Sequence, residues 1–384
     1  MANKRIFYAV QRAGITPMTN TNDYTTIRGL QTLGVTTTFN LEQVFEIGQL
    51  AVYENIEGVP DVEVQTEKVM DGWAPVYTLA TQRNAEGDPA PNSTLVGRSQ
   101  GLCRMAIAIY EETNTYAEVQ DSQTRPGAEV HMSGLYMSSV GYAVSVDGNA
   151  TETCTLVGNN KVWVLGGDTG NFHAAYSLTA ATWLPNPGPW SIGNTDPKSI
   201  AGSGGVNRRE DVLFGSGSNV SLLPLNMPGV INGGGCSGLN MLNAEGNFGV
   251  HVQSWNVNTD LGREELFELG RRGTYYRYIN FPVEVTNELT VISVSGDMIS
   301  ATEDGIYDNG LGGCGNRYNL VDQCIKLVLC EGLVVDSGTK NKLSSVGVSG
   351  GDAGGGNVEV TYSYTNFNEM DVKHPNDPIV DLRP

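Results

Sequence analysis

Two segments of the sequence alternate polar and apolar side chains with a period of two residues. In residues 61–67, DVEVQTE, every second side chain is acidic or an amide, and Val, Val and Thr lie between them. Residues 281–297, FPVEVTNELTVISVSGD, alternate in the same way: Val283, Val285, Leu289 and Val291 share one parity, and Glu284, Thr286 and Glu288 share the other. A period of two is typical of a strand that buries one face. The sequence therefore predicts strands with an apolar side and an acidic side.

The acidic sides of these strands have two interpretations. Carboxylates on an exposed strand face usually do no more than meet solvent. Alternatively, strands repeated in many copies build a deliberately anionic surface. The candidate residues for that surface are Asp61, Glu63, Glu67, Glu284 and Glu288.

The net charge limits the partners that the chain can have. The sequence has 23 basic and 42 acidic residues, which gives a formal net charge of −19. Such a surface repels nucleic acid phosphates and anionic membranes. The charge therefore disfavours conventional DNA binding, whereas a surface that DNA passes without adhering agrees with it.

A longer stretch of sequence occurs twice in similar form. Residues 35–72 are echoed by 255–297: FEIG is followed by tyrosine and VPDVEV in the first, and FELG by tyrosines and FPVEV in the second. One explanation is chance similarity between β-rich segments. The other is an internal duplication, which predicts two related halves that pack with pseudo-twofold symmetry.

Strand patterns dominate the remaining sequence, and one helix is expected. Residues 141–158 predict a hairpin with its turn at 147–149. Residues 260–271 predict a helix, with Asp260 as N-cap and with Leu266, Phe267 and Leu269 as its packing side. A shorter helix is expected to begin at Asn40.

The distribution of strand and loop patterns suggests one core with insertions. With 384 residues, the chain is long enough for one large or two medium domains. Residues 1–166 and 207–384 are expected to form the β-rich core together, and 167–206 a loop-rich insertion. Residues 83–98 and 302–319 predict further loops. No apolar run reaches the length of a membrane span, and the N-terminus has no secretory signal pattern, which favours folding in the cytoplasm.

The six cysteines have no metal-binding spacing. Cys324 and Cys330 are expected in one strand, too far apart to bond to each other. Cys236 and Cys314, each in a Gly-rich loop, are the candidates for a disulfide bond. The other cysteines are predicted to be buried free thiols.

The sequence shows no pattern of an enzyme active site or of a cofactor site. The four histidines are scattered, and none lies in a metal-binding motif. The Gly-rich segments lack the spacing of a nucleotide-binding loop. We therefore expect no catalytic, cofactor or metal site. A glycan-binding module is a remote alternative, because the following tryptophans could stack on sugars: Trp73, Trp163, Trp183, Trp190 and Trp255.

Several segments together resemble the major tail tube proteins of tailed bacteriophages. They are GYAVSVDGNATETCTLVGNNKVW, VNRREDVLFGSGSNVSLLPLNMPGV, LGREELFELGRRGTYYRYINFPVEVT, VDSGTKNKLSSVGVSGGDAGGGNVEVTYSYTNFN and FNLEQVFEIGQLAVYENIEGVPDVEVQTEKVMDGW. The resemblance implies a mainly β fold, a β-sandwich or barrel of tail-tube type with one flanking helix, about 260–271, and long loop insertions.

The resemblance also implies a structural function. Six copies would form a ring, the rings would stack into a tube, and the acidic strand residues would line its lumen, through which DNA is ejected. An internal duplication would allow three chains to form a ring instead. The implied partners are further copies of the chain, the tape measure, baseplate and tail terminator proteins, and a sheath protein in a contractile tail. The implied location is the virion tail, assembled in the host cytoplasm. Alternatives are a baseplate hub, a tail terminator or a capsid decoration protein.

Overall fold

The structure is a computed structural model. It describes residues 6, 11–18, 24–48, 50–110, 128–165, 205–214, 220–224, 251–270, 273–292, 303–304, 319–320, 322–350, 356–375 and 377.

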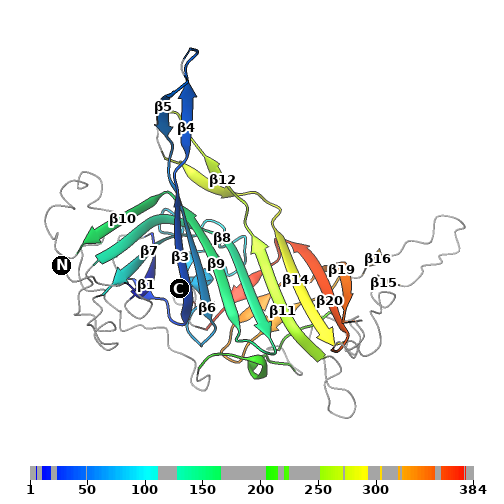
Figure 1. The fold of residues 1–384 in the computed structure, drawn as a ribbon. Helices are drawn as coiled ribbons and strands as arrows, with labels where there is room; N and C mark the ends of the chain where they lie inside the picture. The colour runs from blue at the N-terminus through cyan, green and yellow to red at the C-terminus, as the bar shows by residue number, and fades with distance from the viewer. Residues whose placement is uncertain are drawn as a thin grey trace, which may run out of the picture.

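The described part of the chain is mainly β, as the sequence predicts (Figure 1). The largest sheet has 12 strands, all paired antiparallel. They are β1 (Gln11–Pro17), β2 (Thr25–Thr26), β3 (Leu30–Thr38), β6 (Asp61–Val69), β7 (Leu102–Ile109), β8 (Ala128–Ser145), β9 (Thr151–Gly158), β10 (Asn160–Leu165), β11 (His251–Asp260), β14 (Glu284–Ile292), β19 (Lys342–Ser349) and β20 (Glu359–Phe367).

The long strand β8 connects two parts of this sheet. Its first half pairs with β7 and β10, and its second half pairs with β9 and β11. We call the run β3–β6–β9–β8–β11–β14–β20–β19 the main sheet. The strands β1 and β2 extend the other part beyond β7.

One face of the main sheet is covered by a second layer. This layer contains the three-stranded sheet of β17 (Lys326–Val328), β18 (Val334–Asp336) and β21 (Asp371–Lys373), and the short helix α1 (Val76–Ala80). The apolar side chains of both layers form one core, which includes Val64, Tyr142, Trp255, Leu289 and Tyr362. A short 3₁₀ turn, η2, lies at Arg209–Asp211, and β15 (Glu303–Asp304) pairs with β16 (Asn319–Leu320).

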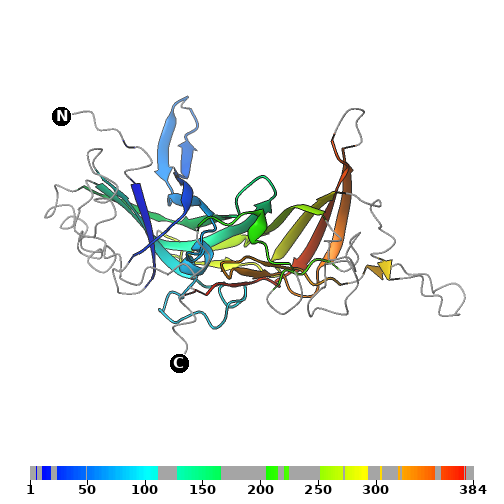
Figure 2. The same cartoon turned by 90° about the horizontal axis from the view of Figure 1, so that it is seen from below.

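Two hairpins project from the main sheet. The first is β4 (Leu41–Phe45) with β5 (Val52–Glu57), and it joins β3 to β6. The second is β12 (Arg263–Leu266) with β13 (Tyr276–Ile279), and it joins β11 to β14. In Figure 2, the β4–β5 hairpin and the end of the sheet with β19 and β20 project to the side opposite the covering layer.

The helix predicted at 260–271 is wrong, and so is the shorter helix at Asn40. Residues 263–266 and 41–45 are strands of the two hairpins. Leu266, Phe267 and Leu269 do not form a buried helix side, since they are 39%, 62% and 106% exposed. The reason is tertiary: long-range contacts of the β12–β13 hairpin, described below, outweigh the weak local preference for a helix.

The two echoing segments have the same order of elements. Each consists of a long strand, a projecting hairpin and a second long strand that pairs with the first. The duplication itself stays a prediction, as do the boundaries of the core. Residues 166–204, most of the expected insertion, lie outside the described residues. Among the described residues, no helix is both long and apolar enough to cross a membrane.

Candidate functional site

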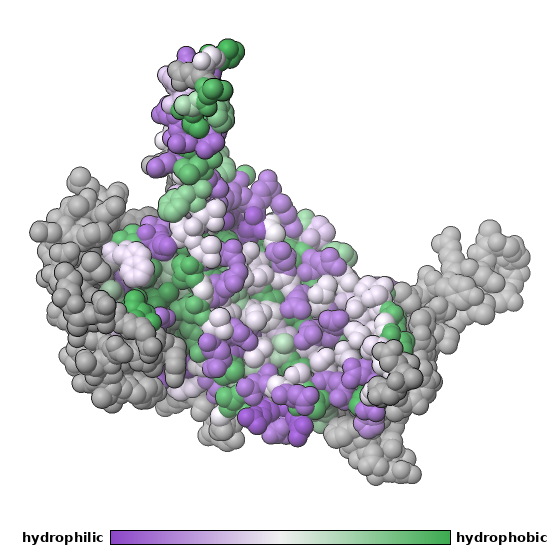
Figure 3. Space-filling view, viewed as in Figure 1, coloured by the Kyte–Doolittle hydropathy of each residue, from purple (hydrophilic) through white to green (hydrophobic). Residues whose placement is uncertain are grey.

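The face of the main sheet that points away from the core is polar. Its acidic residues are Asp61, Glu63, Glu67, Asp260, Glu284, Glu288 and Glu359, and its hydroxyl residues include Thr153, Thr155, Ser139, Thr286, Thr361, Ser363 and Thr365. We call this surface the polar face. In Figure 3 it is mainly purple and white over β6, β9, β11 and β14. The strands β3, β6, β9, β11, β14 and β20 carry one lysine and no arginine, and this lysine, Lys68, is buried on the opposite side.

The structure places the predicted acidic residues together on the polar face. Glu284 and Glu288 are exposed on β14, whereas Glu63 and Glu67 are half-buried on β6. Glu63 Oε1 accepts a hydrogen bond from Gln65 Nε2 at 2.7 Å, and Glu67 Oε2 accepts one from the Thr32 hydroxyl at 3.1 Å. These four carboxylates come from two distant parts of the sequence and line one continuous surface.

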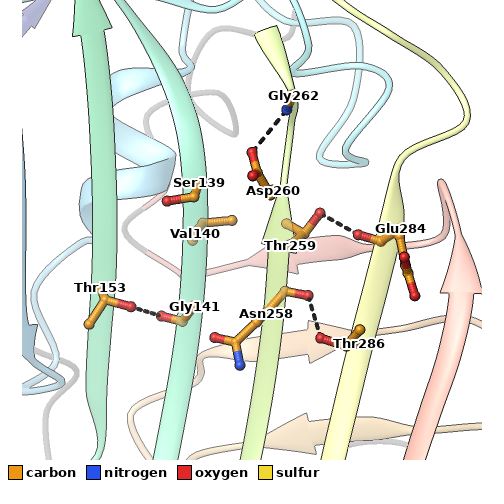
Figure 4. Close-up of a pocket in the computed structure, with 10 residues that line it drawn as sticks. All are labelled: Ser139, Val140, Gly141, Thr153, Asn258, Thr259, Asp260, Gly262, Glu284 and Thr286. Carbon is orange, nitrogen blue, oxygen red and sulfur yellow. Dashed lines mark hydrogen bonds between the residues drawn. The ribbon is translucent and has the colours of Figure 1, made fainter. Parts of the chain in front are cut away.

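An open hollow of about 480 Å³ lies in the polar face between β9, β8, β11 and β14 (Figure 4). Gly141 forms its floor, because a Cβ atom there would lie 2.3 Å from Asn258 Oδ1 and 2.8 Å from Thr153 Oγ1. The Thr286 hydroxyl donates to the Asn258 carbonyl at 3.2 Å, so this hydroxyl is satisfied by the neighbouring strand. None of the residues that line the hollow is a nucleophile with an adjacent base. The hollow is a shallow depression in the surface of the sheet.

The fifth predicted acidic residue, Asp61, has a different role. Its Oδ1 lies 3.0 Å from Arg277 Nη2 on β13, and it also accepts from Asn159 Nδ2 at 3.1 Å. Arg277 is buried and forms a second ion pair with Glu265 on β12. Asp61 therefore attaches the β12–β13 hairpin to the start of β6.

Further contacts hold the same hairpin over β8. Arg263 Nε donates to the Met137 carbonyl at 2.5 Å, and Arg263 Nη2 donates to the Ser99 carbonyl at 2.9 Å. Burial lowers the pKa of the Arg263 guanidinium to about 10. The rings of Tyr276 and Tyr136 meet edge to face, with centroids 5.7 Å apart. No sequence pattern predicts these contacts, because their partners lie more than a hundred residues away.

The β4–β5 hairpin, in contrast, exposes apolar side chains on both of its faces. Ile47 and Leu50 at its tip are 103% and 107% exposed, and Phe45 and Tyr53 are 64% and 61% exposed. The projecting hairpin carries green, hydrophobic areas in Figure 3. An isolated two-stranded hairpin of this kind is marginally stable in water, so its apolar surface indicates a protein partner.

The edges of the main sheet are a second surface suited to assembly. Within the described residues, β3 pairs only with β6, and β19 pairs only with β20. Their outer edges therefore have no strand partner in this part of the chain. Backbone N–H and C=O groups along such an edge are a template for another strand.

Two buried carboxylates support the polar face from below. Glu152 on β9 accepts from the backbone N–H groups of Val76 and Tyr77 at 2.6 and 3.1 Å, and so caps the first turn of α1. Burial raises the pKa of Glu152, although these hydrogen bonds act in the opposite direction. Burial also raises the pKa of Glu331 to about 7. Both carboxylates are buried by tertiary contacts that the sequence does not reveal.

The remaining predicted residues lie apart from the polar face. Cys103 and Cys154 are buried free thiols, as predicted, and Cys330 is free but exposed. The predicted bond between Cys236 and Cys314 lies outside the described residues and stays a prediction. Cys324 is disulfide-bonded, so the prediction that it is a free thiol is wrong.

The features of a sugar site or a metal site do not converge. Trp255 is 2% exposed in the core, so it does not serve as a sugar platform, and Trp183 and Trp190 lie outside the described residues. No group of three or more His, Cys, Asp or Glu residues in the described part of the chain could hold a metal ion. That the chain has no enzymatic activity stays a prediction.

Comparisons with known proteins give only partial structural likeness. No family model and no curated protein matches the chain. A chain of the cryo-EM structure of the anti-feeding prophage baseplate is 13% identical, with a TM-score of 0.30 over 43% of this chain and 97% of that chain. A chain of the anti-feeding prophage cap, the tube terminating cap, is 9% identical, with a TM-score of 0.30 over 43% and 95%. Likeness at this level carries no argument about function.

Proposed function

We propose that the chain is a structural subunit of a phage-type tail, whose copies join into a ring around a channel. The observation that carries this proposal is the main sheet. One face is buried under a second layer, the other is acidic and rich in hydroxyl groups, and both edges are unpaired in the described part of the chain. A sheet with these properties is suited to continue into the sheet of a neighbouring copy.

The polar face would then be the wall of the channel. Glu63, Glu67, Glu284 and Glu288 would repel the DNA backbone from all sides, which keeps a passing duplex from adhering. Rings of this kind stacked into a tube would form the conduit for DNA ejection. The tape measure, baseplate and terminator proteins are the partners that such a tube requires.

A ring of low copy number, such as a baseplate hub or a tail terminator, is the second candidate function. The observation that favours it is the strand–hairpin–strand arrangement that occurs twice in one chain. If six such arrangements close a ring, three chains are sufficient. Copy number separates the two functions, because a tube subunit is among the most abundant proteins of a particle and a hub is scarce.

Electron microscopy of the purified chain tests the proposal. We expect rings with a central channel in negative stain, and a molar mass by light scattering that is a multiple of the 41.1 kDa chain. Long stacks of rings would favour the tube, and single rings would favour the hub or terminator. A monomer that persists at high protein concentration would contradict both.

A further inference from the structure

The main sheet consists of two runs of four strands with the same spatial order. The first run is β3–β6–β9–β8, and the second is β11–β14–β20–β19. In each run, a projecting hairpin connects the first two strands. The other two are consecutive in the chain and pair with each other. The second run therefore lies beside the first in the sheet, as a repeat of the same four-stranded unit would.

The registers of the strand pairs fix which positions correspond in the two runs. Glu67 lies opposite Thr153, and Glu288 lies opposite Ser363, so we match Glu67 to Glu288. The other matches on the polar face follow from the ladders: Thr32 with Asn256, Gly34 with Asn258, Thr153 with Ser363, Gly141 with Ser345, Ala143 with Gly347 and Val157 with Phe367.

Within one chain, the two runs meet where β8 pairs with β11. This junction has seven residue pairs, and Gly141 lies opposite Asn258 in it. We infer that the same junction joins two copies of the chain: β19 of one copy pairs antiparallel with β3 of the next, with Ser345 opposite Gly34. The inference rests on the proposed function, since a ring needs such a contact, and it adds the strands and the register.

Side chains at the two edges agree with this junction. On the core side, Leu33 and Val35 of β3 and Val346 of β19 are only half-buried, and Val348 is 62% exposed. Pairing of the edges would extend the core from one copy into the next and cover these residues. On the polar face, the junction would place Gly347 opposite Thr32 and Ser345 opposite Gly34. Each of these two pairs contains a glycine, so no two large side chains would meet there.

The hairpins extend the same correspondence. The β12–β13 hairpin of the second run lies on the first run, where the Thr274 hydroxyl donates to Asn159 Oδ1 at 2.6 Å and Tyr276 contacts Tyr136. The equivalent receiving surface on the second run is near Phe367, which is 56% exposed. The β4–β5 hairpin of the next copy would lie there, and its exposed apolar residues would meet Phe367.

Lysines also lie at this surface, where Lys340 Nζ is 3.9 Å from Glu369 Oε1 and Lys342 Nζ is 2.8 Å from Asp322 Oδ1. Residues 41–57 contain four glutamates and no lysine or arginine. Lys340 and Lys342, with side chains 74% and 51% exposed, lie at the start of β19 beside the receiving surface. A second copy of the chain therefore supplies both the strand and the hairpin that fit this end of the molecule.

Disulfide cross-linking tests the register. The variant carries Gly34→Cys and Ser345→Cys, with Cys330→Ser to remove the exposed free thiol. Mild oxidation is expected to give about tenfold more covalent multimer than a control pair, because Cβ atoms of directly opposed residues lie about 4.5–5.5 Å apart. The control pair is Gly34→Cys with Ser349→Cys, which the same register separates by about 13 Å. Ala143→Cys with Asn256→Cys checks the chemistry at the junction within one chain.

Electron microscopy of the same samples distinguishes a failure of the inference from a failure of the proposed function. Rings whose multimers depend on the Gly34–Ser345 pair support the inference. Rings that cross-link equally well through Ser349, or through neither pair, overturn the register but leave the ring. Absence of both rings and multimers, while the Ala143–Asn256 bond forms within the chain, overturns the inference and the proposed function together.

Discussion

At the scale of single residues, Glu331 is a buried carboxylate whose ionisation destabilises the fold. Glu331 is 0% exposed. Its Oε2 accepts from the Gly72 N–H and from Asn207 Nδ2, the latter at 2.5 Å. Burial raises its pKa from 4.5 to about 7. The folded state therefore retains a proton that the unfolded chain releases, so stability falls as pH rises from about 4.5 to about 7 and is constant above.

We expect Glu331→Gln to remove this part of the pH dependence. Gln keeps the two accepted hydrogen bonds without a charge, so the variant gains stability over the wild type as pH rises from 5 to 8. The gain is on the order of 3 kcal/mol for the full shift. Urea unfolding at several pH values measures it. Burial also lowers the pKa of His374, to about 4, but His374 is present in both proteins and its effect cancels in the difference. Parallel stability curves would contradict the assignment.

The carboxylates of the polar face are expected to matter for DNA and not for folding. The variant Glu63→Gln, Glu67→Gln, Glu284→Gln and Glu288→Gln should still form rings and should bind a short duplex at least about tenfold more tightly at low salt, since less charge repels the phosphates. Fluorescence anisotropy with labelled DNA measures this. The control changes four exposed acidic residues elsewhere, Glu86, Asp88, Asp147 and Glu210, to their amides. An equal effect in the control would show that only net charge matters.

At the scale of elements, the β12–β13 hairpin depends on Arg277. Its guanidinium lies between Asp61 and Glu265, and the Asp61 side chain is 43% exposed. Arg277→Met would leave two carboxylates close together without a cation, and we expect a loss of about 1–3 kcal/mol in the free energy of unfolding. Arg209→Met is the matched control, because its ion pair with Glu210 is exposed and its loss should change little. Chemical denaturation of both variants decides the point.

The β4–β5 hairpin should be dispensable for folding and required for assembly. Replacing residues 45–53 by Asn-Gly closes the hairpin after the Val44–Glu54 pair with a favoured two-residue turn. We expect an unchanged thermal unfolding temperature of the monomer, because the described residues among those removed are exposed, and loss of oligomers in light scattering. Wild-type rings from the shortened chain would contradict a role of this hairpin in assembly.

The elements also show how far the sequence could predict the structure. The alternation in 61–67 and 283–291 correctly predicts β6 and β14 and their buried sides. It does so because one side of each strand faces the apolar core and the other side belongs to the polar face. The helix predicted at 260–271 is wrong because Arg263 and Arg277 find their partners, Met137 and Asp61, in distant segments. A local pattern of charges cannot reveal such partners. For the same reason, the cap that Glu152 provides for α1 was not predictable.

At the scale of the whole molecule, a buried amide network connects the main sheet to the covering layer. Asn341 Oδ1 accepts from Asn287 Nδ2 at 3.1 Å and from Asn366 Nδ2 at 2.7 Å. Its own Nδ2 donates to the Gln323 and Ser337 carbonyls, at 3.0 and 3.1 Å. One side chain therefore links β14 and β20 to the loop that precedes β19.

We expect Asn341→Ala to destabilise the molecule by about 1–3 kcal/mol, since the buried Asn287 Nδ2 loses its acceptor, Asn341 Oδ1. Urea denaturation gives the value, and Asn357→Ala, at an exposed position, is the control. If both variants unfold at the same urea concentration, the network does not hold the layers together.

The tandem order of the main sheet makes its two ends unlike each other. One end offers β3 and the other offers β19, so copies joined through them follow one another head to tail and never meet as a twofold pair. A head-to-tail series has no intrinsic last member, and only the bend from each copy to the next decides whether it returns to its start. A substitution that flattens the sheet would therefore yield open ribbons of indefinite length instead of single molecules.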